Sequence, residues 1–184
     1  MFRSTIVGVL LASLAVLGMT AQAASADPPA KAEIGGLYSV HHNDAGTFPL
    51  GWMFAVGGNV TNTIAIVGEI GGGYKSINES GFDLTIKEHT FLGGVKFASR
   101  RSRAAVPFVQ VLTGIGNFGA GAAGYSASVN AFAFQTGGGV DIRMGSRSAL
   151  RVQGDYRLLR REGHNLNEFR FAAGVMFGFG KATP

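Results

Sequence analysis

The chain has 184 residues, no cysteine and a formal net charge of +5 at pH 7; 46% of its residues are hydrophobic and only 15% are charged. The absence of cysteine excludes a disulfide framework, thiol chemistry and cysteine-ligated zinc. The positive charge favours acidic partners such as lipid phosphates. Beyond residue 26, no segment has the run of about 18 apolar residues that a membrane helix needs.

The chain begins with a predicted secretory signal peptide, residues 1–26. Arg3 precedes an apolar run from Ile6 to about Gly18, and small residues then form A-x-A sites that end at Ala23 and Ala26. The pattern fits cleavage of the signal peptide after Ala23 or after Ala26. We expect export of a one-domain chain with a short periplasmic segment at 27–33, a barrel over 34–180 and a tail at 181–184.

Period-two alternation of large apolar with small or polar residues runs through the mature chain. In one segment, Trp52, Phe54 and Val56 alternate with Met53 and Ala55. Eight segments show this pattern: Glu33–His41, Leu50–Val60, Thr63–Lys75, Thr85–Ala98, Ala105–Gly116, Asn130–Arg143, Ser148–Leu159 and Asn167–Phe179. Repeated segments of about ten alternating residues are typical of transmembrane β-barrels.

The composition of the two faces indicates which one is inside. A soluble barrel of the lipocalin kind would turn its bulky apolar face inward. The bulky face is too large for the interior of an eight-stranded barrel, whereas the other face is rich in the chain's 29 glycines and in alanine and glutamine. The sequence therefore predicts an all-β fold, an eight-stranded antiparallel up-and-down transmembrane β-barrel with its bulky face towards lipid.

The connections predict the orientation of this barrel. Hydrocarbon cannot satisfy an open strand edge, so the sheet must close, and an even strand number places both termini in the periplasm. Short periplasmic turns are expected near Asn62, Arg100–Arg103 and Gly145, and longer outer loops over 42–49, 76–84, 117–129 and 160–166. The outer-loop candidates for contact with surface-lipid phosphates or adhesion partners are His42, Asp44, Tyr125, Arg160, Arg161 and His164.

Several stretches carry a resemblance to a known family. GWMFAVGGNVTNTIAIVGEIGGGY, HTFLGGVKFASRRSRAAVPFVQVLTGIG, AFQTGGGVDIRMGSRSALRVQGDYRLLRR and NEFRFAAGVMFGFG resemble the small outer-membrane β-barrel domain proteins of Gram-negative bacteria, of the OmpA/OmpX type. The resemblance implies a monomer in the outer membrane, lipopolysaccharide neighbours and handling by the barrel-assembly machinery. The chain departs from the family's terminal aromatic, because GKATP follows Phe179.

Two glycine motifs suggest nucleotide binding, and neither has the required context. Gly114, Gly116 and Gly119 form G-x-G-x-x-G, but no helix start follows to receive a pyrophosphate. GEIGGGYKS has Tyr74 where a P-loop needs its lysine. We expect Gly114 and Gly116 on the inward face of a strand and Gly119 in a loop, and we assign no nucleotide, nucleic acid or other cofactor.

Charged residues are predicted inside the barrel. By strand parity the inward set is Glu69, Lys96, Asp141, Arg151, Asp155, Arg157 and Arg170, with Gln110, Gln135 and Gln153 among them. Buried charges must pair or reach water, and arginine favours bidentate contacts with carboxylates. The set is expected to form a polar plug or, alternatively, the gate of a narrow channel.

Catalysis is a further alternative, because some outer-membrane barrels modify lipids. The general-base candidates are His41, His42, His89 and His164, but no H-x-S pair occurs, and Ser39 and His41 both point inward by parity. His41, His42 and Asp44 could hold a metal, although a polar loop explains them equally. We assign no catalytic residue and no metal site.

Overall fold

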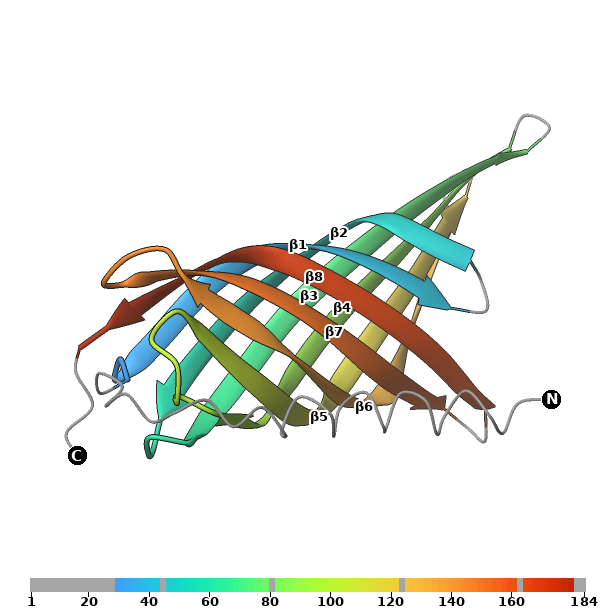
Figure 1. Cartoon of the computed structure of the whole chain (residues 1–184). Coiled ribbons are helices and arrows are strands. Elements are labelled where there is room, and N and C mark those ends of the chain that lie inside the picture. Colours follow the sequence, from blue (N-terminus) through green and yellow to red (C-terminus); the bar gives the residue numbers. More distant parts are fainter. Residues whose placement is uncertain (1–28, 44–45, 80–81, 123–124, 162–163, 181–184) are drawn as a thin grey trace, which may run out of the picture.

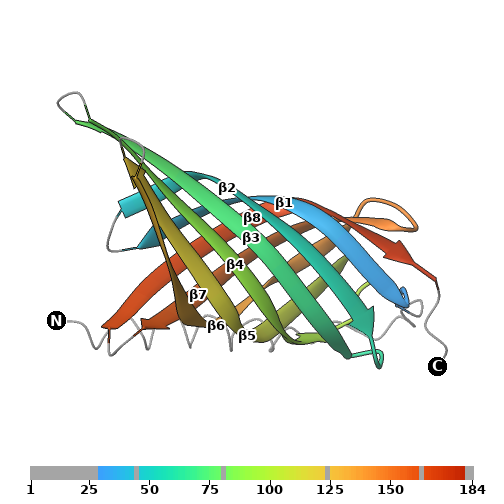
Figure 2. The same cartoon turned by 180° about the vertical axis from the view of Figure 1, so that it is seen from behind.

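The computed structural model is a closed antiparallel barrel in which each strand pairs with its neighbours in the chain and β8 pairs with β1 (Figures 1 and 2). It describes residues 29–43, 46–79, 82–122, 125–161 and 164–180, so the predicted signal peptide and residues 181–184 lie outside it. The strands are β1 (Ala32–Asn43), β2 (Gly46–Asn59), β3 (Ile64–Glu79), β4 (Phe82–Ala98), β5 (Ala105–Ala122), β6 (Tyr125–Arg143), β7 (Ser148–Arg161) and β8 (His164–Phe179). No helix in the described part of the chain is long and apolar enough to cross a membrane.

The barrel has two different ends. At one end, which we call the turn end, the chain enters and leaves, and the Lys31 amide donates to the Gly180 carbonyl. Short turns over 60–63, 99–104 and 144–147 join strands there. At the other, the hairpin end, the strand pairs β1–β2, β3–β4, β5–β6 and β7–β8 meet, and the β3–β4 hairpin projects beyond the barrel wall (Figure 1).

The structure corrects the extent of the predicted outer loops. The β3–β4 ladder continues to Glu79 and Phe82, and the β5–β6 ladder to Ala122 and Tyr125. Most of the residues predicted as loop are therefore paired strand. Glycine, serine and asparagine weaken the alternation in these segments, but backbone hydrogen bonds need no particular side chain.

Pro49 produces the one irregularity that matters for the interior. The β1–β2 register slips between Ser39, opposite Gly51, and His41, opposite Phe48. Proline has no N–H for the ladder and is tolerated at bulges. Because of the slip, Phe48 is buried while Pro49 and Leu50 are both exposed, so the ring of Phe48 reaches His41.

The two faces of the wall differ as the sequence predicts. Large apolar side chains project outward; Phe91 is 54% exposed and Phe171 is 71% exposed. The inward apolar side chains gather in patches, of which one contains Leu37, Met53 and Met176, and polar and charged residues lie among them. The all-β closed barrel with its bulky face outward is thus confirmed.

Both glycine motifs lie in strands. Gly114, Gly116 and Gly119 are all in β5, and β6 follows them in place of a helix. The expectation of Gly119 in a loop is wrong, because it pairs with Lys87 and Ser128. Gly72, from the second motif, lies beneath the Trp52 indole, which occupies the space of a side chain.

Close strand approach makes Gly114 sensitive to substitution. A Cβ atom there would lie 1.9 Å from the Phe91 carbonyl oxygen, whereas a Cβ at Gly36 meets nothing within 4 Å. We predict that Gly114→Val lowers the free energy of unfolding by about 1–3 kcal/mol, through overpacking. Urea unfolding of the refolded barrel measures this, with Gly36→Val as the control; equal effects at both positions would contradict the prediction.

Candidate functional site

A column of buried polar side chains fills the barrel from end to end, and it divides into three clusters. The turn-end cluster is Glu33, Lys96, Asp141 and Arg151; the central cluster is Glu69, Gln110, Gln135, Gln153, Asp155 and Arg170; the hairpin-end cluster is His41, Glu88, Arg157 and Glu168. Successive side chains of a strand face opposite sides of the sheet. Because the large apolar residues face outward, the residues between them face the interior and form this column.

The turn-end cluster has balanced charge. Arg151 donates from Nε to Asp141 Oδ1 at 2.6 Å and from Nη2 to Glu33 Oε1 at 3.1 Å. Lys96 also pairs with Glu33. The ring of Phe108 lies beneath both cations, with its centroid 4.7 Å from the Arg151 Cζ and 5.5 Å from the Lys96 Nζ. Two carboxylates and two cations therefore satisfy one another over an aromatic floor.

The central cluster is built on one arginine between two carboxylates. Arg170 donates from Nη2 to Glu69 Oε2 at 2.6 Å and to Asp155 Oδ2 at 2.7 Å. Gln110 and Gln135 donate to the two oxygens of Glu69 at 2.7 and 3.0 Å. Glutamine amides thereby supply the donors that a second cation would otherwise have to supply.

The hairpin-end cluster repeats this arrangement with a different neighbour. One nitrogen of Arg157, Nη1, contacts Glu88 Oε1 and Glu168 Oε1, each at 2.8 Å. His41 takes the place that glutamines take in the central cluster, and its Nε2 lies 3.5 Å from Glu88 Oε2 and 4.0 Å from Glu168 Oε2. Gln135 joins the two clusters, because its Oε1 accepts from Arg157 Nε at 3.1 Å.

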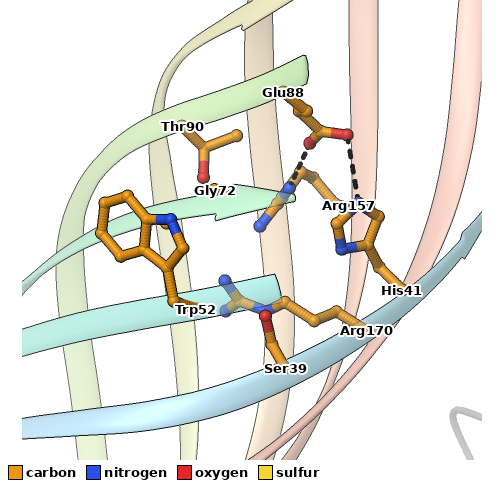
Figure 3. A pocket seen from close by; sticks show the side chains of 9 residues that line it. Ser39, His41, Trp52, Gly72, Glu88, Thr90, Arg157 and Arg170 are labelled. Atoms are coloured by element: carbon orange, nitrogen blue, oxygen red, sulfur yellow. Dashed lines mark hydrogen bonds and ion pairs between the residues drawn. The ribbon is translucent and has the colours of Figure 1, made fainter. Parts of the chain in front are cut away.

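A small cavity adjoins the hairpin-end cluster (Figure 3). Its volume is about 10 Å³, room for about one water molecule. Ser39, His41, Thr90, Arg157 and Arg170 are among the residues that line it. The cavity can hold a small polar ligand but is far too small for a lipid chain or a nucleotide.

The structure brings the seven charged residues predicted inside the barrel into this column. Six are buried, and Asp141 is partly buried at the turn end. Sequence reasoning missed three acids of the column, Glu33, Glu88 and Glu168, although the parity that turns Lys96 and Arg170 inward also turns Glu88 and Glu168 inward. Glu33 belongs to β1, where it pairs with Gly57 and Gly178, and not to a segment before the barrel.

The outer-loop candidates that the structure describes lie in strands. His42, Arg160 and Arg161 are exposed residues of β1 and β7. Tyr125 begins β6 and His164 begins β8, while Asp44 lies outside the described residues. The sequence predicts loops there because the alternation of apolar with polar residues stops before these positions. In the structure, the backbone pairing of the strands continues beyond the end of the alternation.

The metal alternative that joined His41 to His42 is wrong. The two histidines are consecutive in β1, so their side chains leave opposite faces. His41 is 3% exposed inside the barrel, whereas His42 is exposed and bonds to Thr47 Oγ1 through Nδ1 at 2.9 Å. One ion cannot reach both rings.

Removal of the central arginine tests the energetic role of the column. We predict that Arg170→Met lowers the free energy of unfolding by about 3–5 kcal/mol, because Glu69 and Asp155 would lose their shared cation in a buried site. Arg160→Met, at an exposed position of β7, should change it by less than about 1 kcal/mol. Urea titration of both variants measures the difference, and adding Glu69→Gln to Arg170→Met should recover part of the loss. Similar stabilities for the two arginine variants would refute the assignment.

Comparison with known proteins identifies the fold. No family model matches the chain, and no curated protein matches its sequence. Among solved structures, Neisserial surface protein A aligns with a TM-score of 0.63 at 10% identity over 80% of this chain and 96% of that one. Ail of Yersinia pestis, in complex with the heparin analogue sucrose octasulfate, aligns at 0.54 and 17% identity over 82% and 99%. OprG of Pseudomonas aeruginosa aligns at 0.54 and 8% identity over 84% and 98%. The chain therefore has the fold of the eight-stranded outer-membrane β-barrels.

Proposed function

We propose that this protein is an integral outer-membrane β-barrel with a structural or surface-interaction role and a sealed, charge-paired interior. The observation that carries the proposal is the inversion of polarity across the wall. Large apolar side chains encircle the outside while charged residues fill the inside, which is the arrangement a barrel needs in lipid and the reverse of a soluble one.

Aromatic residues with polar tips support a membrane position. Tyr38, Trp52, Tyr74 and Tyr156 lie on the outer face, each in the half of its strand nearer the hairpin end. Tyr38 is 55% exposed and Trp52 is 40% exposed. Such side chains concentrate at the boundary between hydrocarbon and headgroups, so we place this ring at the outer boundary of the membrane.

Basic residues level with these aromatic side chains or nearer the hairpin end suit contact with surface lipid. Lys87, Arg160 and Arg161 are exposed near the hairpin end. We propose that they face the phosphates of the outer leaflet, for which arginine offers bidentate hydrogen bonds. The signal peptide, the periplasmic placement of the termini and assembly by the barrel machinery belong to the same proposal.

Membrane placement predicts a position-dependent cost for charge on the outer face. Phe134→Arg, in the middle of β6, should lower the free energy of unfolding in phospholipid vesicles by about 2–4 kcal/mol. Asn130→Arg lies on the same face of the same strand, nearer the hairpin end, and should cost about 0–1 kcal/mol. Urea titration of refolded protein gives both values, and fractionation should place the wild type with outer membranes. Recovery of the wild type from the soluble fraction would contradict the proposed outer-membrane location.

The packed interior predicts a barrel that does not conduct. Gln110, Gln135 and Glu168 at the axis are each no more than 1% exposed, and eight-stranded barrels generally have just enough interior for their side chains. The refolded wild type should therefore give a silent planar bilayer, with a porin as positive control. Discrete conductance steps in the wild type, altered by Glu69→Ala or Arg170→Ala, would show the channel alternative to be right.

A further inference from the structure

Three donor atoms from distant parts of the chain converge at the hairpin-end cluster. They belong to His41 of β1, Glu88 of β4 and Glu168 of β8, each of which offers one ligand atom within 4.8 Å of the other two. His41 Nε2 lies 3.5 Å from Glu88 Oε2 and 4.0 Å from Glu168 Oε2. The three residues are buried, with exposures of 3%, 2% and 0%. Figure 3 shows the His41 ring and the Glu88 carboxylate pointing towards each other across the interior.

Two of these atoms lack any hydrogen-bond partner. Among the described residues, His41 Nε2 and Glu88 Oε2 are buried without one. The third, Glu168 Oε2, accepts a long contact of 3.4 Å from Asn43 Nδ2. Buried polar atoms in folded proteins are almost always satisfied, so these poorly satisfied polar atoms facing one point leave a place for a further partner, either a proton or a cation.

The central cluster shows what is missing. Both clusters place one arginine between two carboxylates, which leaves one excess negative charge when both carboxylates are ionised and His41 is neutral. In the central cluster, glutamine amides donate to the carboxylates. In the hairpin-end cluster an imidazole stands in that place, and a neutral imidazole with a free Nε2 offers a lone pair rather than a donor.

Neighbouring groups fix the orientation of the donor atoms. Arg157 Nη1 holds Oε1 of Glu88 and of Glu168, which leaves the Oε2 atom of each for the shared point. The His41 ring stacks on Phe48 with centroids 4.7 Å apart. On Gly73, a Cβ atom would lie 2.0 Å from His41 Cε1, so glycine is required for the ring to lie where it does. Such supports hold metal ligands in position.

We propose that His41, Glu88 and Glu168 bind a divalent first-row transition-metal ion, with zinc as the reference ion. One imidazole and two carboxylates suit such an ion, and a fourth position open to water is common where the protein supplies three ligands. The adjoining cavity has room for that water. Ligands 2.1 Å from a tetrahedral ion are about 3.4 Å apart. The His41 Nε2 distances of 3.5 and 4.0 Å are near this value, and the ligand atoms, which lie within 4.8 Å of one another, would move together on binding.

The test uses the mature chain, refolded in detergent and freed of metal with a chelator. Zinc sulfate titrated into it should bind with one ion per chain in a calorimeter. X-ray absorption of the complex should show one imidazole nitrogen and two or three oxygens near 2.0–2.1 Å. Zinc should also raise the temperature at which the protein loses its folded gel mobility, because the ion joins β1, β4 and β8 across the barrel. Calcium, which prefers more oxygen ligands, should bind at least tenfold more weakly.

Two variants and a control assign the ligands. His41→Phe and Glu168→Gln should each weaken zinc binding by at least ~100-fold, the upper end of what loss of a supporting residue alone costs. His42→Ala removes the adjacent exposed histidine and should leave the affinity unchanged. Folded gel mobility without zinc checks that each variant is a barrel.

Three results would overturn the proposal: no zinc binding by folded wild type, binding that His42→Ala abolishes, or absorption spectra without imidazole. If a proton on His41 takes the place of the ion, the folded wild type will not bind zinc. NMR spectra of the wild type would then show an imidazolium signal that zinc does not shift. None of these results bears on membrane placement, which the Phe134→Arg and Asn130→Arg pair tests separately.

Discussion

Burial of charge inside a closed barrel governs how the side chains of this protein are arranged. The alternation of a strand is strict, so an apolar outer wall commits every second side chain to an interior with little water. Six carboxylates and four cations occupy the described interior, and Arg151, Arg157 and Arg170 each bridge two carboxylates. Each arginine pairs with one carboxylate on a neighbouring strand and with a second carboxylate on a strand that is not its neighbour. The column therefore ties separate parts of the wall together as well as neutralising charge.

The unequal count of acids and bases gives the three clusters different characters. The turn-end cluster is neutral, since Lys96 supplements Arg151. The central cluster retains one excess negative charge and spreads it over glutamine amides. The hairpin-end cluster has no glutamine donor to its carboxylates, and its amide contact is the 3.4 Å one from Asn43 to Glu168. Among the described residues, the buried side-chain atoms without a hydrogen-bond partner are Gln153 Oε1 in the central cluster and His41 Nε2 and Glu88 Oε2 in the hairpin-end cluster. The hairpin-end cluster is where two such atoms face each other.

The sequence predicted the parts of this fold that depend on local alternation. Strand number, closure and the outward bulky face follow from a period of two, and the same parity turns Glu69, Lys96 and Arg170 inward. The outer extent of the ladders could not be read, because glycine and serine pair as well as valine while showing no alternation. Pro49 is the last residue of a predicted outer loop, but in the structure it lies in β2 at a bulge that brings Phe48 onto His41.

The sequence could not predict which residues of the column contact one another, and the reason is different. Glu69 on β3 meets Arg170 on β8, and Glu88 on β4 meets Glu168 on β8 through Arg157 on β7. Which inward residues share a level depends on the stagger accumulated around the whole barrel, not on any pair of segments. The packed turn-end and central clusters close the axis, so a ligand at His41 is most directly reached from the hairpin end. The His41 and Glu88 atoms without a hydrogen-bond partner lie in the cluster nearest that end.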